Sequence, residues 1–230
     1  MSAEGSEFDR LFYPFLFEGE MVSADEVLAQ VRHSTLEKCR EVVALRGAML
    51  EQSRQQLIAA GKAMARAFAD GGTLLAFGSG GSTTDAEDIV GELLAPPFPN
   101  ARSLPAIAQT NDIAVITAIG NDVGFENIFA RQVIAFGRPG DIAFGISTSG
   151  NSLNMVQAFE QAKRQGLLTI GMAGYDGGNM ARSPALDFCL ITRSDFVPRI
   201  QEAQATAYHA LLEIIFACVA DQGTAREHIA

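Results

Sequence analysis

The sequence predicts an α/β protein built on a doubly wound, five-stranded parallel sheet flanked by helices, with an N-terminal helical extension. Five short apolar runs alternate with helical patterns between residues 73 and 221, the order that winds a parallel sheet. Two of these runs end in loops rich in glycine and serine. Apolar residues make up 48% of the 230 residues, enough for a sheet covered on both faces.

The chain is expected to begin with helices. Ser23-Ala24-Asp25-Glu26 has the pattern of a helix cap, and apolar residues at helical spacing follow to residue 50. A second helix is expected over about residues 54–69, with Gly71-Gly72 ending it. Residues 8–21 are rich in Phe and Leu, so we expect this segment to pack on a neighbouring surface or subunit.

The alternating region defines the domain. Its apolar runs are predicted to be buried parallel strands, at residues 73–77, 105–109, 141–147, 167–173 and 186–192. Helical patterns lie at residues 83–95, 124–136, 152–165 and about 199–221. We therefore expect an apolar extension over residues 1–22, a single domain over residues 23–221 that includes the N-terminal helices, and a tail over residues 222–230.

Two glycine- and hydroxyl-rich loops indicate a bound anion. After the first strand comes Gly78-Ser79-Gly80-Gly81-Ser82-Thr83-Thr84, and after the third comes Ser147-Thr148-Ser149-Gly150-Asn151-Ser152. Each loop runs into a helical pattern, so it presents backbone N–H groups and hydroxyls that bind phosphate without a cationic side chain. Ligands of doubly wound sheets lie at the carboxyl ends of the strands, where both loops fall. Two such loops predict a phosphorylated small molecule.

Composition disfavours several other classes of function. The net charge is −10 without a dense run of Lys or Arg, which argues against direct binding of nucleic acid. No apolar run reaches the roughly 18–20 residues of a membrane-spanning helix, and the acidic start lacks the basic residues of a signal peptide. We expect a soluble cytoplasmic protein without membrane contact. Cys39, Cys189 and Cys218 form no CxxC pair and are expected to be buried free thiols.

Several polar residues have both a structural and a functional interpretation. Asp88 and Glu92 share a helix face, either as an acidic first turn favoured by the helix dipole or as a base and metal ligand. His209 lies on a mostly apolar helix, where histidine is either packed and hydrogen-bonded or functional. Asn121 and Asp122 lie in a turn and cap signature that predicts a helix start, with their side chains satisfying backbone groups.

Gln201 precedes His209 by two turns of the last helix. A straight helix places them about 12 Å apart along its axis. A single metal bound by both therefore requires Gln201 to lie in a bent or barely begun first turn.

Many short motifs occur in one order along the chain: residues 78–82, Asp85-Ala86, Glu92-Leu93, residues 104–108, residues 117–122, Gly124-Phe125-Glu126, residues 129–133, residues 137–141, residues 145–152, residues 176–178 and residues 199–203. Together they resemble the sugar isomerase (SIS) family, which has a flavodoxin-like fold, and within it the phosphoheptose isomerase branch. The resemblance covers about residues 24–221 and leaves residues 1–22 outside.

The resemblance implies a homotetramer that interconverts sedoheptulose 7-phosphate and a heptose 7-phosphate, often with zinc and without a nucleotide cofactor. It implies that Glu92 is the base that moves a proton between C1 and C2, and that His209 handles the sugar oxygens and ring opening. Such a reaction passes through an enediol, which requires these two kinds of group. The implied ligands of zinc or another divalent metal are Asp88, Glu92, Gln201 and His209. The implied substrate and phosphate positions are Ser79, Gly80, Gly81, Ser82, Asn121, Asp122, Ser147, Thr148, Ser149, Ser152 and Gln201.

The chain departs from the family pattern at several positions, which are Ser79 for Asn, Asp88 for a metal-ligand His, Pro96 for Arg, Pro198 for Asp and Gln204 for His. Asp88 makes the implied metal site richer in oxygen. Pro96 and Pro198 weaken the implication of heptose specificity, whereas the fold and the phosphate loops are unaffected.

Two functions are therefore weighed. The first is a sugar-phosphate isomerase, favoured by the presence of Glu92, Gln201 and His209 together. The second is a non-catalytic protein of the same fold, either a sugar-phosphate sensor or a tetrameric adaptor of the type that binds a bacterial replication initiator. The departures from the pattern and the apolar residues 8–17 favour the second. We expect the enzyme.

Overall fold

The computed structural model describes residues 24–227, and side chains up to residue 220. The chain divides into two compact units, residues 1–41 and 42–230. Helix α2 (Ala24–Ala69) runs from the first into the second, which holds the sheet and the residues of the expected site. The expected extension over residues 1–22 and the cap residue Ser23 lie outside the described residues.

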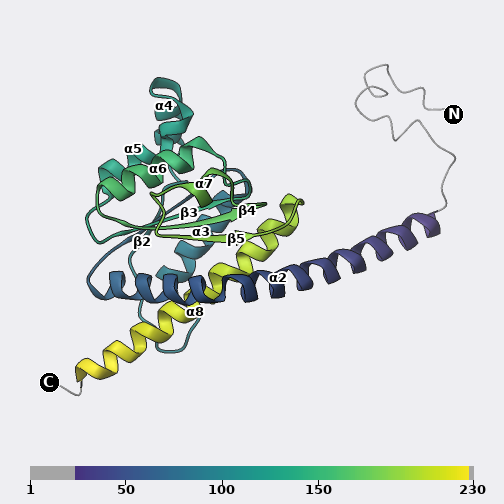
Figure 1. The fold of residues 1–230 in the computed structure, drawn as a ribbon, viewed down its shortest axis with the longest axis horizontal. Coiled ribbons are helices and arrows are strands. Elements are labelled where there is room, and N and C mark those ends of the chain that lie inside the picture. Colours follow the sequence, from purple (N-terminus) through teal and green to yellow (C-terminus); the bar gives the residue numbers. More distant parts are fainter. Residues whose placement is uncertain (1–23, 228–230) are drawn as a thin grey trace. The chain divides into compact units, whose positions relative to one another are not determined.

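A five-stranded parallel sheet forms the centre of the second unit (Figure 1), as predicted. Its strands are β1 (Leu74–Gly78), β2 (Ala106–Ala108), β3 (Ile142–Ser147), β4 (Leu168–Gly174) and β5 (Phe188–Thr192). They lie in the order β2-β1-β3-β4-β5, the flavodoxin-like order of a doubly wound sheet. The helices are α3 (Gly81–Leu94), α4 (Ile113–Asp122), α5 (Ile128–Phe136), α6 (Leu153–Arg164), α7 (Gly178–Arg182) and α8 (Val197–Glu227), with a 3-10 turn η2 (Phe125–Asn127) before α5.

Helices cover both faces of the sheet (Figure 1). Leu74 and Ala76 of β1 belong to a core shared with α2, α3 and α8, whereas Leu75 and Phe77 belong to a core shared with α5 and α6. Successive side chains of a strand point to opposite faces. Every residue of β1 and β3 is buried. Burial on both faces is the reason that the strands read as continuous apolar runs.

The N-terminal helices predicted as two are one helix of 46 residues. One of the glycines inside it is accommodated by packing: a Cβ on Gly61 would lie 2.6 Å from Cγ2 of Ile214, so α8 approaches the backbone closely there. The helix ends as predicted. Gly71 has φ +91°, and the N–H of Gly72 donates to the carbonyl of Ala67, a glycine-terminated helix end.

Helix α4 was not predicted. The side chain of Asp112 accepts a hydrogen bond from the N–H of Val115 (3.0 Å) and caps its start. The turn-like residues 117–122 therefore form the second half of a helix, and the prediction of a helix start at Asn121 and Asp122 is wrong. Their side chains bond to each other (2.7 Å) rather than to the backbone. The pattern misled because α4 has no fully buried residue and only Ile116 and Ile119 of its apolar side chains pack partly against the core.

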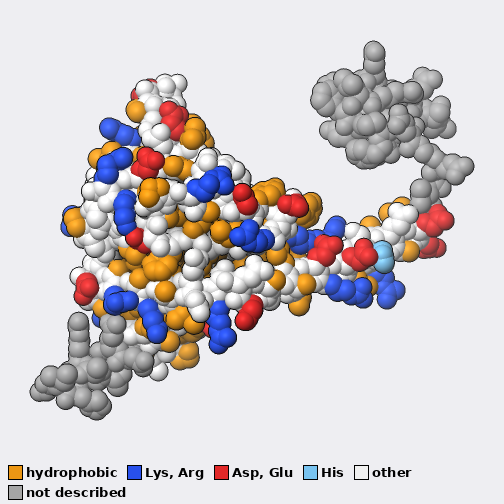
Figure 2. Space-filling view, viewed as in Figure 1, with side chains coloured by type: hydrophobic (Ala, Val, Ile, Leu, Met, Phe, Trp, Pro, Cys, Tyr) orange, Lys and Arg blue, Asp and Glu red, His pale blue; other side chains and the backbone are white. Residues whose placement is uncertain are grey.

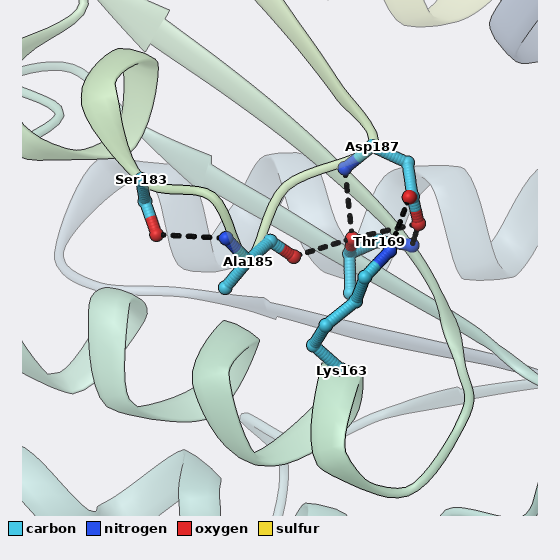
Figure 3. Close-up of polar contacts among 5 residues, drawn as sticks. All are labelled: Lys163, Thr169, Ser183, Ala185 and Asp187. Atoms are coloured by element: carbon cyan, nitrogen blue, oxygen red, sulfur yellow. Dashed lines mark hydrogen bonds and ion pairs between the residues drawn. The ribbon is translucent and has the colours of Figure 1, made fainter.

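A polar cluster around the buried Thr169 joins β4 to β5 and α6 (Figure 3). Asp187 accepts hydrogen bonds from the hydroxyl and the N–H of Thr169 (3.0 Å each), and it forms an ion pair with Lys163. Burial acts to raise the pKa of the Asp187 carboxyl, but the hydrogen bonds from Lys163 and Thr169 outweigh burial and hold that pKa below its ordinary value. The cluster fixes the end of the sheet that lies away from the candidate site.

Two expectations drawn from composition need correction. The three cysteines are free, as expected, but Cys39 is exposed and Cys189 and Cys218 are only partly buried. Among the described residues, one stretch, Val197–Ala220 of α8, is long and apolar enough to cross a membrane, although no such run was expected. Its apolar residues include Ile200, Leu211 and Ile215, which are fully buried in this fold, as in the core helix of a water-soluble α/β domain.

Gly145 provides a test of the packing between β3 and the helices. A Cβ there would lie 2.6–2.8 Å from Phe159, Phe77 and Met155. We expect Gly145→Ala to destabilise the fold by about 1–3 kcal/mol through overpacking. Gly47→Ala, in an exposed part of α2 with no atom near its Cβ, should gain up to about 1 kcal/mol. Denaturant melts of both variants check this, and equal stability of the two would contradict it.

Candidate active site

The two predicted anion-binding loops meet at one edge of the sheet. β1 and β3 are neighbours, and Gly78 pairs with Ile146, so the loops after these strands emerge side by side. Nδ2 of Asn154, on α6, donates a hydrogen bond to the hydroxyl of Ser79 (3.0 Å). This bond joins the first loop to the helix that follows the second. The position is the carboxyl edge of a doubly wound sheet next to the strand at which the order reverses, where ligands of such folds bind.

The first loop is shaped by its glycines. Gly80 has φ +62°, a conformation that side chains disfavour. A Cβ on Gly78 would overlap the carbonyl of Ser82, so the chain turns back on itself directly after β1. The hydroxyl of Thr83 donates to the carbonyl of Gly78 (3.2 Å). Helix α3 then begins at Gly81 without a side-chain cap, so its N-terminal end faces the loop.

The second loop is held by its own hydroxyls. Oγ of Ser147 accepts the N–H of Gly150 (3.1 Å), and Oγ of Ser149 accepts the N–H of Asn151 (3.2 Å). Ser152 precedes α6 without capping it through its side chain, so this helix also starts with open N–H groups. Both loops have the features required of a phosphate site, and the phosphate roles of their residues stay predictions.

A cluster of three titratable side chains lies between α3 and α8. Ligand atoms of Asp88, Glu92 and His209 all lie within 4.8 Å of one another. Nε2 of His209 is 3.2 Å from Oε1 of Glu92 and 3.8 Å from Oδ2 of Asp88. Asp88 and His209 keep about half of their side-chain surface exposed, and Glu92 about a quarter (50%, 45% and 26%). The cluster is reachable from solvent, as a catalytic or metal site must be.

The acidic pair is not a first-turn feature. Helix α3 begins at Gly81 and has no acidic residue in its first turn, so Asp88 and Glu92 lie in its second half. The dipole at that end of a helix disfavours carboxylates. The interpretation of these residues as dipole-stabilised is therefore wrong, and their position calls for another partner.

The ring of His209 is oriented by the backbone of its own helix. Nδ1 lies 2.6 Å from the carbonyl oxygen of Ala205. Because a carbonyl only accepts hydrogen bonds, we assign the proton to Nδ1. Nε2 then faces Glu92, either with a lone pair for a metal ion or with a second proton to donate.

Gln201 contacts α3 nearer the start of that helix than Tyr208 and His209 do. It lies on the regular part of α8, which begins at Val197, and its Nε2 donates to Oδ2 of Asp85 (3.1 Å). Burial, together with the nearby charge of Asp88, raises the pKa of Asp85 to about 6, although the hydrogen bond from Gln201 acts in the opposite direction. The role of Gln201 as a metal or substrate ligand stays a prediction, as do the substrate roles of the exposed Asn121 and Asp122.

Two residues of the site were missed in the sequence. Asn154 links the loops as described, and it could have been found only by knowing that they meet. Tyr208 donates from its hydroxyl to Oδ2 of Asp88 (2.6 Å), and its ring stacks on that of His209. Burial and the bond to Asp88 raise the pKa of Tyr208, so it remains a donor. Its place beside His209 in the sequence was the available signal.

Asp85 gives a prediction about pH. Its pKa of about 6 in the native state lies above the ordinary 3.8, so between these values the native state binds more protons than the unfolded state. Stability therefore falls as the pH rises through this window. In metal-free protein, we expect Asp85→Asn to raise Tm relative to the wild type at about pH 7.5 and to have little effect near pH 4. The exposed Asp70→Asn serves as control. A difference in Tm that does not change with pH would contradict the prediction.

The comparisons with known proteins agree with this geometry. Residues 39–174 match the SIS domain family. The chain is 45% identical over 152 residues to the phosphoheptose isomerase of Geotalea daltonii, which covers 66% of this chain and 78% of the relative. It is 42% identical over 176 residues to that of Aquifex aeolicus, covering 76% and 91%.

Solved structures show the same fold. The phosphoheptose isomerase GmhA from Neisseria gonorrhoeae has a TM-score of 0.74 at 32% identity, covering 80% of this chain and 98% of that one. The phosphoheptose isomerase from Francisella tularensis has a TM-score of 0.68 at 35% identity, covering 86% and 100%. Because the family match covers more than half of the chain and lies on the sheet and loops described above, the chain belongs to the SIS domain family.

Proposed function

We propose that this protein is a sugar-phosphate isomerase that interconverts an aldose and a ketose, with sedoheptulose 7-phosphate or a similar sugar phosphate as substrate. The observation that carries the proposal is the pair formed by Glu92 and His209, 3.2 Å apart between α3 and α8. The relatives named phosphoheptose isomerase support it. An enzyme is favoured over a non-catalytic sensor or a replication-initiator adaptor, because the proposed base and its partner are both present in this chain and in contact.

The loops hold the substrate by its phosphate. The hydroxyls of the two loops, together with the N-termini of α3 and α6 that lack side-chain caps, would bind a dianion without a cationic side chain. This accounts for phosphate binding by a chain with a net charge of −10. The phosphate anchors the sugar so that its other end reaches the cluster between α3 and α8.

Glu92 and His209 divide the proton transfers. The carboxylate of Glu92 takes the proton from one of the two carbons C1 and C2 and returns it to the other, so that a carbon-bound proton is neither gained nor lost. His209 moves the proton between the two sugar oxygens through Nε2. Its ring is fixed for this role, because Nδ1 is occupied by the carbonyl of Ala205.

The cluster also fits a divalent metal ion. Asp88, Glu92 and His209 offer two carboxylates and one imidazole within 4.8 Å of one another. Gln201, the implied fourth ligand, is bonded to Asp85 on the regular part of α8, so it would have to turn away from Asp85 to bind an ion together with His209. A bound divalent ion would polarise the sugar carbonyl and hydroxyl oxygens in place of proton transfer by His209, because Nε2 cannot ligate an ion and carry a proton at the same time. With Asp88 in the place of the family histidine, the donors are mostly oxygen, so metals such as Mn²⁺ compete with Zn²⁺ better than at a nitrogen-rich site. No nucleotide cofactor is expected.

We also propose a homotetramer in the cytoplasm. Helix α4 carries exposed apolar side chains, with Ile113 exposed by 70%, and Phe125 and Val123 follow at 58% and 48%. Figure 2 shows hydrophobic side chains reaching the surface in this part of the unit. A helix this apolar with no buried residue is typical of an interface, and we propose a second copy of the chain as its occupant.

Glu92→Gln tests the proposed chemistry. The amide keeps the volume of the side chain but cannot accept a carbon-bound proton, so kcat with sedoheptulose 7-phosphate should fall by about 10²–10⁴-fold. The substrate should still raise Tm, since the phosphate loops are intact. Glu87→Gln, on the exposed side of the same helix, is the control and should retain activity. A Glu92→Gln variant as active as the wild type would rule out the proposed base.

Ile113→Asp tests the interface. A charge at this exposed apolar position should shift the sedimentation profile at micromolar concentration from tetramer toward smaller species. Ile113→Val keeps the apolar surface and should leave assembly unchanged. The proposed use of α4 would be contradicted if Ile113→Asp assembled as the wild type does.

A further inference from the structure

Tyr208 joins the hydrophobic core to the candidate site. Only 3% of its surface is exposed, and it belongs to the core shared by α2, α3, α8 and the sheet. Its hydroxyl nevertheless reaches Oδ2 of Asp88 at 2.6 Å. Its ring stacks on the imidazole of His209, with centroids 4.6 Å apart and an interplanar angle of 29°. One side chain thus contacts two of the three members of the cluster.

Asp88 needs such a support. It is half exposed and lies one turn before the like-charged Glu92, which repels it. A short carboxylate at the surface has several rotamers, and only some of them point into the cluster. The phenol of Tyr208 is anchored by its buried ring. A hydrogen bond from this rigid donor to Oδ2 holds the oxygen that lies 3.8 Å from Nε2 of His209 in one orientation. A carboxylate oxygen has two lone pairs, so Oδ2 can accept this bond and still face a cation.

The ring of Tyr208 acts on His209 in a second way. Stacking restricts rotation of the imidazole, whose Nδ1 is already bonded to the carbonyl of Ala205. Nε2 is then held toward Glu92 and Asp88. A phenylalanine would provide the same stacking and the same core packing, so the effect of the hydroxyl on Asp88 can be separated from that of the ring.

We propose that Tyr208 is a positioning residue for the cation site, because its hydroxyl holds Asp88 in the orientation in which the carboxylate binds a metal ion. This inference rests on the proposed metal site of the isomerase. Partners that orient a metal ligand typically account for 10–100-fold in metal affinity. The hydroxyl of Tyr208 should therefore affect metal binding more than it affects folding.

The test compares metal affinities of the full chain after metal removal. Zn²⁺ and Mn²⁺ are titrated in competition with a chromophoric chelator, and Co²⁺ absorption reports the ligand geometry. We expect Tyr208→Phe to weaken binding by about tenfold and to alter the Co²⁺ spectrum, with little change in Tm. Tyr175→Phe removes a hydroxyl from a tyrosine outside the cluster and should change neither.

A double-mutant cycle shows whether the effect passes through Asp88. In an Asp88→Asn background, Tyr208→Phe should cost no further affinity, because the carboxylate that it orients is gone. Wild-type affinity in Tyr208→Phe would overturn the inference, and so would an equal loss in both backgrounds. A wild-type protein that binds none of these metals would overturn the metal site and this inference together. Turnover and its loss in Glu92→Gln would then still decide the isomerase separately.

Discussion

The parallel pairing of β1 with β3 determines where the rest of the site lies. Both strands are buried along their whole length, so their register is fixed by packing on two faces. Because Gly78 pairs with Ile146, the loops that follow must leave the sheet together. The hydrogen bond between Asn154 and Ser79 then links the first loop to α6, the helix that follows the second loop. The proposed phosphate site, made of two separate segments, depends on this register, since a slip by one residue would shift one loop by about 3.3 Å relative to the other.

The contact between α3 and α8 brings together the side chains that are proposed to carry the chemistry. Contacts occur in the same order along both helices, with Gln201 on Asp85, Tyr208 on Asp88 and His209 on Glu92. The two segments are over a hundred residues apart, yet they form one polar seam on an otherwise apolar interface. The seam starts beside the first loop, because Gln201 lies against Gly81. In the proposed reaction, the start of α3 would contribute to phosphate binding, and side chains further along α3 and on α8 would act on the reacting carbons.

The sequence was sufficient for the sheet, because a buried parallel strand has a signal that is local and strong. All five strands were predicted to within two residues, and the glycine loops marked their carboxyl ends. The single helix α2 and the exposed helix α4 were not predicted. A glycine such as Gly61 is tolerated because Ile214 packs against it, and α4 has no fully buried residue. Both features depend on contacts with distant segments or other subunits, which the spacing of apolar residues in the sequence does not reveal.

The polar seam could be predicted only in part, for the same reason. Glu92 and His209 were singled out through the family resemblance, whereas Tyr208 and Asn154 were missed. Glu92 lies in the last turn of α3, where the dipole works against a carboxylate, and Asp88 lies one turn before it, so the two like charges need stabilisation from elsewhere. The described structure supplies a phenol and an imidazole from α8. These are hydrogen-bond donors, but only one of them can carry a positive charge. Two carboxylates facing one imidazole leave negative charge in excess, and a divalent cation at this point would balance it, which is the physical argument for a metal beside the proposed base.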